Sequence, residues 1–122
     1  MRIKPEHLRI WTESIGLSEQ IYLVTREFPR SEVFGLTSQL RRSAVSVPAN
    51  IAEGSGRYHT REYIHFLYMA RGSLFELFTL LEISRRLGYI SATNYPQLRG
   101  RCQGLLAGLM ALIHNLESKL RS

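Results

Sequence analysis

Four segments of the chain repeat apolar residues at the spacing of an α-helix. Within each segment the apolar positions advance by three, four or seven residues, which places them on one helical face. In chain order the four stripes are Ile10, Leu17, Ile21, Val24 and Phe28; Val33, Leu36, Leu40, Ala44, Val47 and Ile51; Tyr63, Leu67, Ala70, Leu74, Leu77 and Leu81; and Leu98, Cys102, Leu105, Leu109, Leu112 and Leu116. No segment shows the alternation typical of a strand. The pattern therefore predicts an all-α chain with four amphipathic helices.

Proline, glycine and capping residues set the expected bounds of these helices. The predicted helices cover residues 6–28, 31–54, 60–88 and 92 to near the end of the chain. The first is expected to end at Phe28, because the residue before a proline avoids the helical conformation. The second is expected to begin at Ser31, whose hydroxyl is a common helix cap. Pro96 falls in the first turn of the fourth helix, where proline is tolerated.

Pro48 lies in the middle of the second apolar stripe. A proline inside a helix removes one backbone hydrogen bond and crowds the carbonyl of Ala44. Because the stripe keeps its phase across Pro48, we expect one kinked helix and not two separate ones.

Short connections between long helices favour antiparallel neighbours. The chain is thus predicted to form a single domain over residues 1–122, an antiparallel up-down-up-down four-helix bundle. Its one cysteine, Cys102, excludes an intrachain disulfide and is expected to be a core residue. No apolar run approaches the roughly 20 residues that cross a membrane, and the N-terminus is charged. We expect a cytoplasmic protein without membrane association.

The third helix carries more apolar residues than a bundle core requires. A bundle helix needs about three core positions in seven. Beyond the seam, this helix has Ile64, Tyr68, Phe75 and Phe78 on one side and Phe66, Met69, Leu80 and Ile83 on another. The surplus predicts a contact between copies, hence a homo-oligomer. The alternative is packing under loops within one chain.

A polar stripe follows the second helix beside its apolar stripe. Its members are Gln39, Ser43, Ser46, Asn50, Glu53 and Arg57. A polar seam next to a core seam should be partly buried, and buried polar groups must be paired. We interpret it as an internal network that also satisfies the carbonyl freed by Pro48. The predicted members of this network are Arg42, Ser46, Asn50, Glu53, Ser73 and Glu76. The alternative is a contact for a ligand or a nucleic acid.

The charge of the chain points to an anionic partner. Its net charge is +6 with a pI of about 10.0, and only Lys4 and Lys119 among the sixteen basic residues are lysine. The planar fork of arginine suits phosphate. The candidate nucleic-acid contacts are Arg26, Arg30, Arg41, Arg57 and Arg61. Tyr58 and His59 lie where they could stack on a base. The competing interpretation is a solvated basic surface that reflects a GC-rich genome.

No pattern typical of a catalytic or metal site is present in the sequence. The chain has no aspartate, and its four histidines lie on separate segments. The run Gly54-Ser55-Gly56 lacks the lysine and the spacing of a phosphate-binding loop. We therefore predict a protein that is not an enzyme and holds neither metal nor cofactor.

Several motifs resemble one family. These are FPRSEVFGL at residues 28–36, QLRRSAVSVPANIAEG at 39–54, ARGSL at 70–74 and LGYI at 87–90. They resemble the bacterial four-helix-bundle proteins encoded in intervening sequences of large-subunit ribosomal RNA genes. The resemblance extends over residues 8–115 or so, nearly the whole chain.

This resemblance implies a left-handed four-helix bundle that assembles into a ring-shaped homopentamer. It also links the chain to the accessory variability proteins of diversity-generating retroelements, which are basic pentamers that bind nucleic acid and a reverse transcriptase. No catalytic residue carries over. Two hypotheses follow: an oligomeric module that binds RNA or DNA through arginine–phosphate contacts, or a protein-interaction scaffold such as an accessory subunit of a reverse transcriptase.

Overall fold

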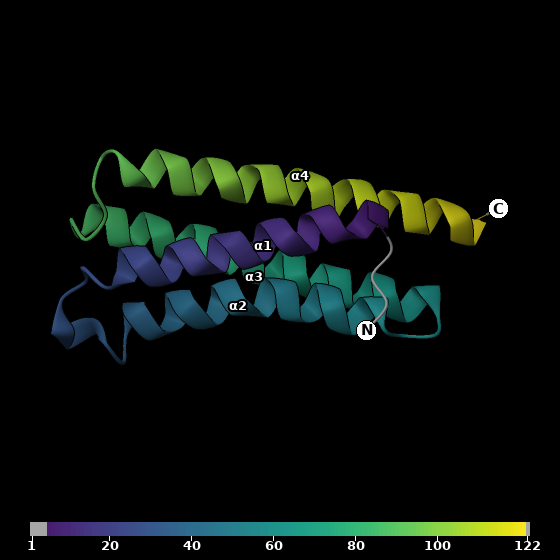
Figure 1. Ribbon diagram of the computed structural model, residues 1–122, viewed down its shortest axis with the longest axis horizontal. Coiled ribbons are helices and arrows are strands. Elements are labelled where there is room, and N and C mark those ends of the chain that lie inside the picture. The colour runs from purple at the N-terminus through teal and green to yellow at the C-terminus, as the bar shows by residue number, and fades with distance from the viewer. Residues whose placement is uncertain (1–4, 122) are drawn as a thin grey trace.

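The computed structural model describes the backbone of residues 5–121 and the side chains of residues 9–121. This part of the chain contains four α-helices, one short 3-10 helix and no strand. The elements are α1 (Pro5–Thr25), η1 (Arg30–Glu32), α2 (Leu36–Ser55), α3 (Thr60–Arg86) and α4 (Asn94–Arg121). Successive helices run antiparallel along one common axis (Figure 1). The predicted all-α four-helix bundle is confirmed.

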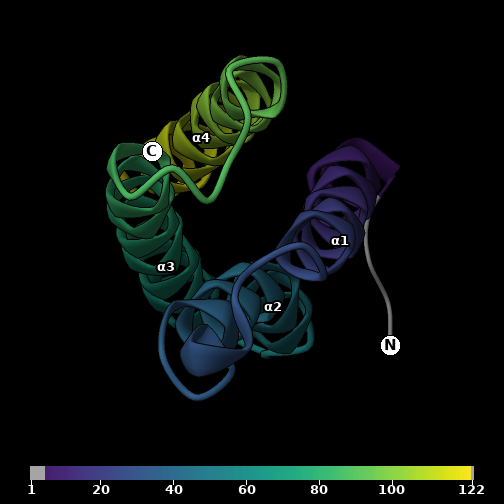
Figure 2. The same ribbon diagram turned by 90° about the vertical axis from the view of Figure 1, so that its left-hand side faces the viewer.

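The helices follow one another around the core in chain order. Viewed along the bundle, α1, α2, α3 and α4 form four sides, and the connections at one end face the viewer (Figure 2). Each helix packs on the next, and α4 returns to contact α1. The contact between α2 and α3 is the most extensive of these, and that between α1 and α4 is the least extensive.

The predicted apolar stripes form the core, with three exceptions near the helix ends. Fully buried members include Ile21, Leu40, Val47, Ile51, Leu67, Leu74, Leu81, Leu98 and Leu109. Val24 and Leu36 are half-buried, and Val33 is exposed because it precedes the second helix and does not lie in it. No helix in the described part of the chain is both long and apolar enough to cross a membrane.

Two expected helix bounds are wrong. The first helix ends at Thr25, three residues before Phe28, and the second begins at Leu36 and not at Ser31. Residues 30–32 form the separate 3-10 helix. The capping acceptor for the second helix is the Glu32 carboxylate, whose Oε1 accepts the Leu36 amide at 3.1 Å. Glu32 therefore takes the role expected of the Ser31 hydroxyl.

The surplus apolar residues of α3 are used mostly within the chain. Ile64 and Leu80 are buried, and Phe66, Tyr68 and Phe78 are half-buried. Met69, Phe75 and Ile83 remain exposed. The alternative of packing within one chain thus accounts for five of the eight residues.

Pro48 is buried inside α2, which continues through it as one helix. The expectation of a single helix is confirmed. The carbonyl of Ala44 loses its intrahelical donor, because Pro48 has no amide hydrogen. The hydroxyl of Ser18 on α1 lies 3.0 Å from this oxygen and is itself buried. The same hydroxyl lies 2.9 Å from the Ser14 carbonyl, so its one hydrogen is shared between the two oxygens. The donor nearest the freed carbonyl thus comes from α1, and not from the polar stripe as expected.

A double-mutant cycle tests this compensation. Ser18→Ala should leave the Ala44 carbonyl without a donor and lower the free energy of unfolding by about 1–3 kcal/mol. In a Pro48→Ala background the amide introduced at position 48 supplies that donor. The same serine substitution should then cost much less, as measured by urea unfolding of all four variants. An equal loss in both backgrounds would contradict the assignment.

Candidate nucleic-acid interface

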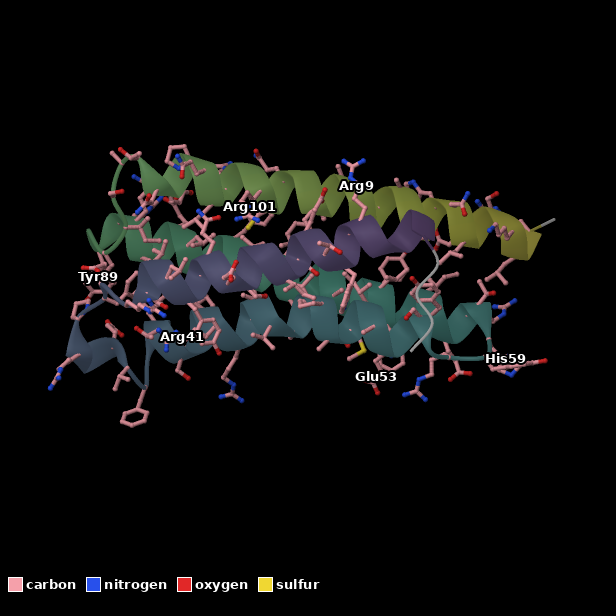
Figure 3. All side chains as sticks on the ribbon, in the orientation of Figure 1. Arg9, Arg41, Glu53, His59, Tyr89 and Arg101 are labelled. Carbon is pink, nitrogen blue, oxygen red and sulfur yellow. The ribbon has the colours of Figure 1, made fainter. Side chains whose placement is uncertain are left out.

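The five arginines predicted from the sequence lie at two different ends of the bundle. Arg26 and Arg30 lie where α1 leads into η1, and Arg57 and Arg61 flank the start of α3. Figure 3 shows the same separation, with Arg41 and Tyr89 toward one end and Glu53 and His59 toward the other. The 20-residue helix α2 separates the two ends by about 30 Å. The five arginines therefore do not form one patch.

We define the turn end as residues 53–62, where α2 leads into α3. This segment holds two arginines against two glutamates. The Arg57 guanidinium lies 3.1 Å from the Glu53 carboxylate and 3.9 Å from that of Glu62, and it covers the ring of Phe66 at 4.8 Å. Arg61 is exposed. The turn end is thus electrically balanced, and Arg57 is already engaged.

Tyr58 and His59 lie at this turn end as the sequence suggested. Tyr58 is 94% exposed, and the two rings meet edge to face with centroids 5.0 Å apart. Their aromatic faces are accessible, although the surrounding charge is neutral.

Arg41 has a structural role that the sequence did not indicate. Its Nε donates to the Thr25 hydroxyl oxygen at 2.9 Å, and an Nη donates to the Tyr22 carbonyl at 3.4 Å. Its guanidinium also lies over the Tyr22 ring at 4.5 Å. Carbonyl groups in the last turn of a helix lack intrahelical donors and favour cations. Arg41 thus caps the end of α1, half-buried, in place of the outer-surface position that was expected.

The polar stripe of α2 forms an internal network only at its centre. The Ser43 hydroxyl donates to the Ser73 carbonyl at 2.9 Å. The Ser46 hydroxyl donates to the Ser73 hydroxyl. Asn50 donates to the Ser46 carbonyl at 2.8 Å. Ser43 is buried and the other three residues are half-buried. The network interpretation therefore holds for Ser46, Asn50 and Ser73, at the centre of α2.

Three predicted members of the network lie outside it. Arg42, Glu53 and Glu76 are exposed. Glu53 pairs with Arg57 one turn later, while Arg42 and Glu76 line a surface notch beside the serines. Glu53 lies near the end of α2 and reaches solvent, whereas Ser43 and Ser46 face Ser73 at its centre.

The sequence interpretation missed three arginines near the end of α3 and the start of α4. Arg85 and Arg86 contact the Glu82 carboxylate at 2.7 and 2.8 Å, and the Tyr95 hydroxyl donates to it at 2.8 Å. These hydrogen bonds, with Arg85 first, hold the pKa of Glu82 well below its usual range. Arg99 lines the same surface hollow as these residues. In the sequence, Glu82 precedes Arg85 and Arg86 by three and four residues, which is the spacing at which side chains pair on a helix. This spacing could have identified the cluster.

We define the basic end as segments 26–42 and 82–99, which meet where Phe28 packs on Tyr89 at 5.4 Å between ring centroids. Together they hold seven arginines against three glutamates. Arg26, Arg30, Arg42 and Arg99 are exposed, and none of their guanidinium groups forms a hydrogen bond or ion pair with another described residue. Positive charge without an internal partner is therefore concentrated at this end.

The glutamates of the basic end are largely occupied. Glu82 is bound by Arg85 and Arg86, as described above. Glu32 accepts the Leu36 amide through one oxygen and the Tyr89 hydroxyl through the other, at 3.1 and 3.2 Å. Burial and this bond to Glu32 raise the pKa of Tyr89. Glu27 is the remaining acid of the two segments, and Glu76 lines the same notch as Arg42. The four unpaired arginines therefore outnumber the carboxylates free to neutralise them.

The described residues contain no group of three or more metal-ligating side chains. Cys102 is buried in the core, and burial raises its pKa to about 12. It is therefore a thiol at neutral pH, as expected of a core residue.

Comparison with known proteins shows both a family and a shared fold. The family model described as 23S rRNA-intervening sequence protein matches residues 6–111. A crystal structure of a protein with unknown function from the S23 ribosomal protein family of Bacteroides thetaiotaomicron is similar, with a TM-score of 0.82 and 22% identity. The match covers 89% of this chain and 98% of the chain in that crystal structure. At 22% identity the likeness supports the fold alone. No curated protein matches. The chain belongs to the 23S rRNA-intervening sequence protein family.

Proposed function

We propose that this chain is a non-catalytic module that binds RNA or DNA through arginine–phosphate contacts at its basic end. The observation that carries the proposal is the set of exposed arginines there, four of which have no partner among the described side chains. A free guanidinium can donate two parallel hydrogen bonds to a phosphate and keeps its charge when water is displaced.

The proposed contacts are mainly to the phosphate backbone. Such contacts release condensed counterions, so affinity depends steeply on salt and little on sequence. Of the arginines predicted from the sequence, Arg26 and Arg30 remain in the proposed interface. Arg42 and Arg99 join them, whereas Arg41 and Arg57 have structural partners. Arg61 lies at the balanced turn end and is not included.

Charge reversal at the two ends tests the proposal with matched variants. Arg26→Glu with Arg30→Glu should weaken binding of a labelled single-stranded RNA at about 50 mM salt, where electrostatic contacts are strong. The slope of log affinity against log salt should also fall by about 0.7 for each lost contact. Fluorescence anisotropy at several salt concentrations measures both quantities.

The matched control is Arg61→Glu with Arg121→Glu, which changes the net charge equally at the other end of the bundle. Both residues are exposed, and neither forms an ion pair with another described residue. The control should retain most of the affinity. Equal weakening by the two pairs would contradict a localised interface, and absence of binding by the unmodified protein would refute the proposed function.

We also propose that the chain self-associates through an apolar face on α1 and α2. Ile15, Ser18 and Tyr22 lie on one stripe of α1, and Ser18 contacts Ala44 of α2, next to Val45. Ile15, Tyr22 and Val45 are each 43% exposed, and the Arg41 guanidinium covers one side of the Tyr22 ring. Exposed apolar faces of this kind are typical of interaction surfaces. Docking of another protein, such as a reverse transcriptase, is the alternative use of the same face.

Light scattering tests self-association. The unmodified protein should give a mass several times that of the 14.1 kDa chain, and Ile15→Glu with Val45→Glu should lower it. A monomeric mass for the unmodified protein at high concentration would refute self-association, whatever its affinity for nucleic acid.

A further inference from the structure

Phe34 is exposed to an unusual degree for a large apolar side chain. It lies between η1 and α2, and its exposed fraction is 94%. The same connection buries Phe28 in the core, with 7% exposed. One phenylalanine of this connection is therefore buried in the core, and the other is exposed to solvent.

The backbone around Phe34 is held by hydrogen bonds on both sides. The Val33 amide donates to the Arg30 carbonyl at 3.1 Å, and the Gly35 amide donates to the Glu32 carbonyl at 2.9 Å. The Glu32 carboxylate links the start of α2 to Tyr89 in the α3–α4 connection. The ring of Phe34 is therefore presented to solvent by an ordered loop. An ordered platform lowers the entropic cost of binding a ligand.

The charges near Phe34 in the chain favour an anionic ligand. Arg30 precedes it by four residues, and Arg26 lies at the end of α1; both are exposed and unpaired among the described side chains. Glu32, the nearest acid in the sequence, uses both carboxylate oxygens within the protein. A flat apolar ring that follows two free guanidinium groups in the same connection matches a ligand that has both flat apolar faces and phosphates.

We propose that Phe34 is a stacking platform for an unpaired base of single-stranded RNA or DNA, with Arg26 and Arg30 binding the neighbouring phosphates. This inference rests on the proposed nucleic-acid binding and specifies its ligand. Aromatic side chains stack on any base, but only where the base is not already stacked in a duplex. Single strands should therefore bind better than the same sequence as a duplex.

Tyr58 provides a matched comparison within the same chain. It is also 94% exposed, but it lies at the turn end, where Glu53 and Glu62 neutralise Arg57. An exposed aromatic ring is thus present at both ends. Two unpaired arginines, Arg26 and Arg30, precede Phe34, whereas Arg61 is the one unpaired arginine of the turn end, where two glutamates balance two arginines. Tyr58 is accordingly not expected to act as the platform.

Fluorescence anisotropy with a labelled single-stranded RNA of about 12 nucleotides, within the usual site sizes, tests the inference. Phe34→Ala should weaken binding by at least about fivefold, the lower end of measured base-stacking effects. Phe34→Leu keeps an apolar side chain but lacks an aromatic face, so it should weaken binding similarly. Phe34→Trp should retain affinity, and Tyr58→Ala should leave it unchanged. Thermal unfolding of the Phe34 variants should match the unmodified protein, because the ring is exposed.

Three results would overturn the inference in distinguishable ways. If the unmodified protein binds RNA and the alanine and leucine variants of Phe34 bind equally well, stacking is refuted while arginine–phosphate binding stands. If the unmodified protein binds neither single strand nor duplex, the proposed function fails as well. If Phe34→Ala lowers the solution mass in the absence of RNA, the ring instead contacts a second copy of the chain.

Discussion

Pro48 removes the amide that would bond to the Ala44 carbonyl inside α2, and the bundle brings Ser18 of α1 to that oxygen. This contact fixes α1 along α2. With α1 so placed, Tyr22 and Thr25 lie beside Arg41, which caps the end of the helix. That cap lies at Thr25, where α1 ends and the α1–α2 connection begins. The contact between α1 and α2 thus carries one polar interaction near the middle of the bundle and another beside the basic end.

The opposite face of α2 packs on α3 through small residues. Ser43 and Ser46 meet Ser73, and Gly54 lies so close to α3 that an added Cβ would come within 2.7 Å of the Phe66 Cβ. Short side chains at these positions permit the close approach, and their hydroxyl groups satisfy the buried polar atoms. Helix α2 therefore contacts each neighbour differently: a serine from α1 compensates its proline, and its own serines bond to α3. This division explains why its sequence mixes apolar and small polar positions.

The helices and core could be predicted because they depend on local periodicity. Stripe members such as Leu40, Leu74 and Leu109 are buried, and any arrangement of the four helices around one core would bury them. Polar contacts depend on which helix lies opposite, and periodicity does not specify that. Arg41 and Arg42 differ by one residue, or about 100° of rotation, yet the first caps α1 and the second faces solvent.

The candidate site was harder to predict for the same reason. Arg30 and Arg99 are distant in the sequence, and contacts of Phe28 and Glu32 with Tyr89 join their segments at one end. From the sequence, the turn end was interpreted as equally basic. The sequence does not show that Arg57 pairs with both Glu53 and Glu62. Glu32 likewise gave no sign that it would turn inward toward Tyr89. Placement of the acids, more than of the arginines, distinguishes the two ends.

The central claim is that nucleic acid binds at the basic end of a helical bundle. Hydrogen–deuterium exchange with and without a single-stranded RNA, at about 50 mM salt, tests it directly for an assembly of any size. Backbone amides in the connections at residues 26–35 and 87–93 should exchange more slowly when RNA is bound. Those at residues 56–60, in the turn end, should not change. Slower exchange confined to residues 56–60, or no change anywhere at saturating RNA, would contradict the account.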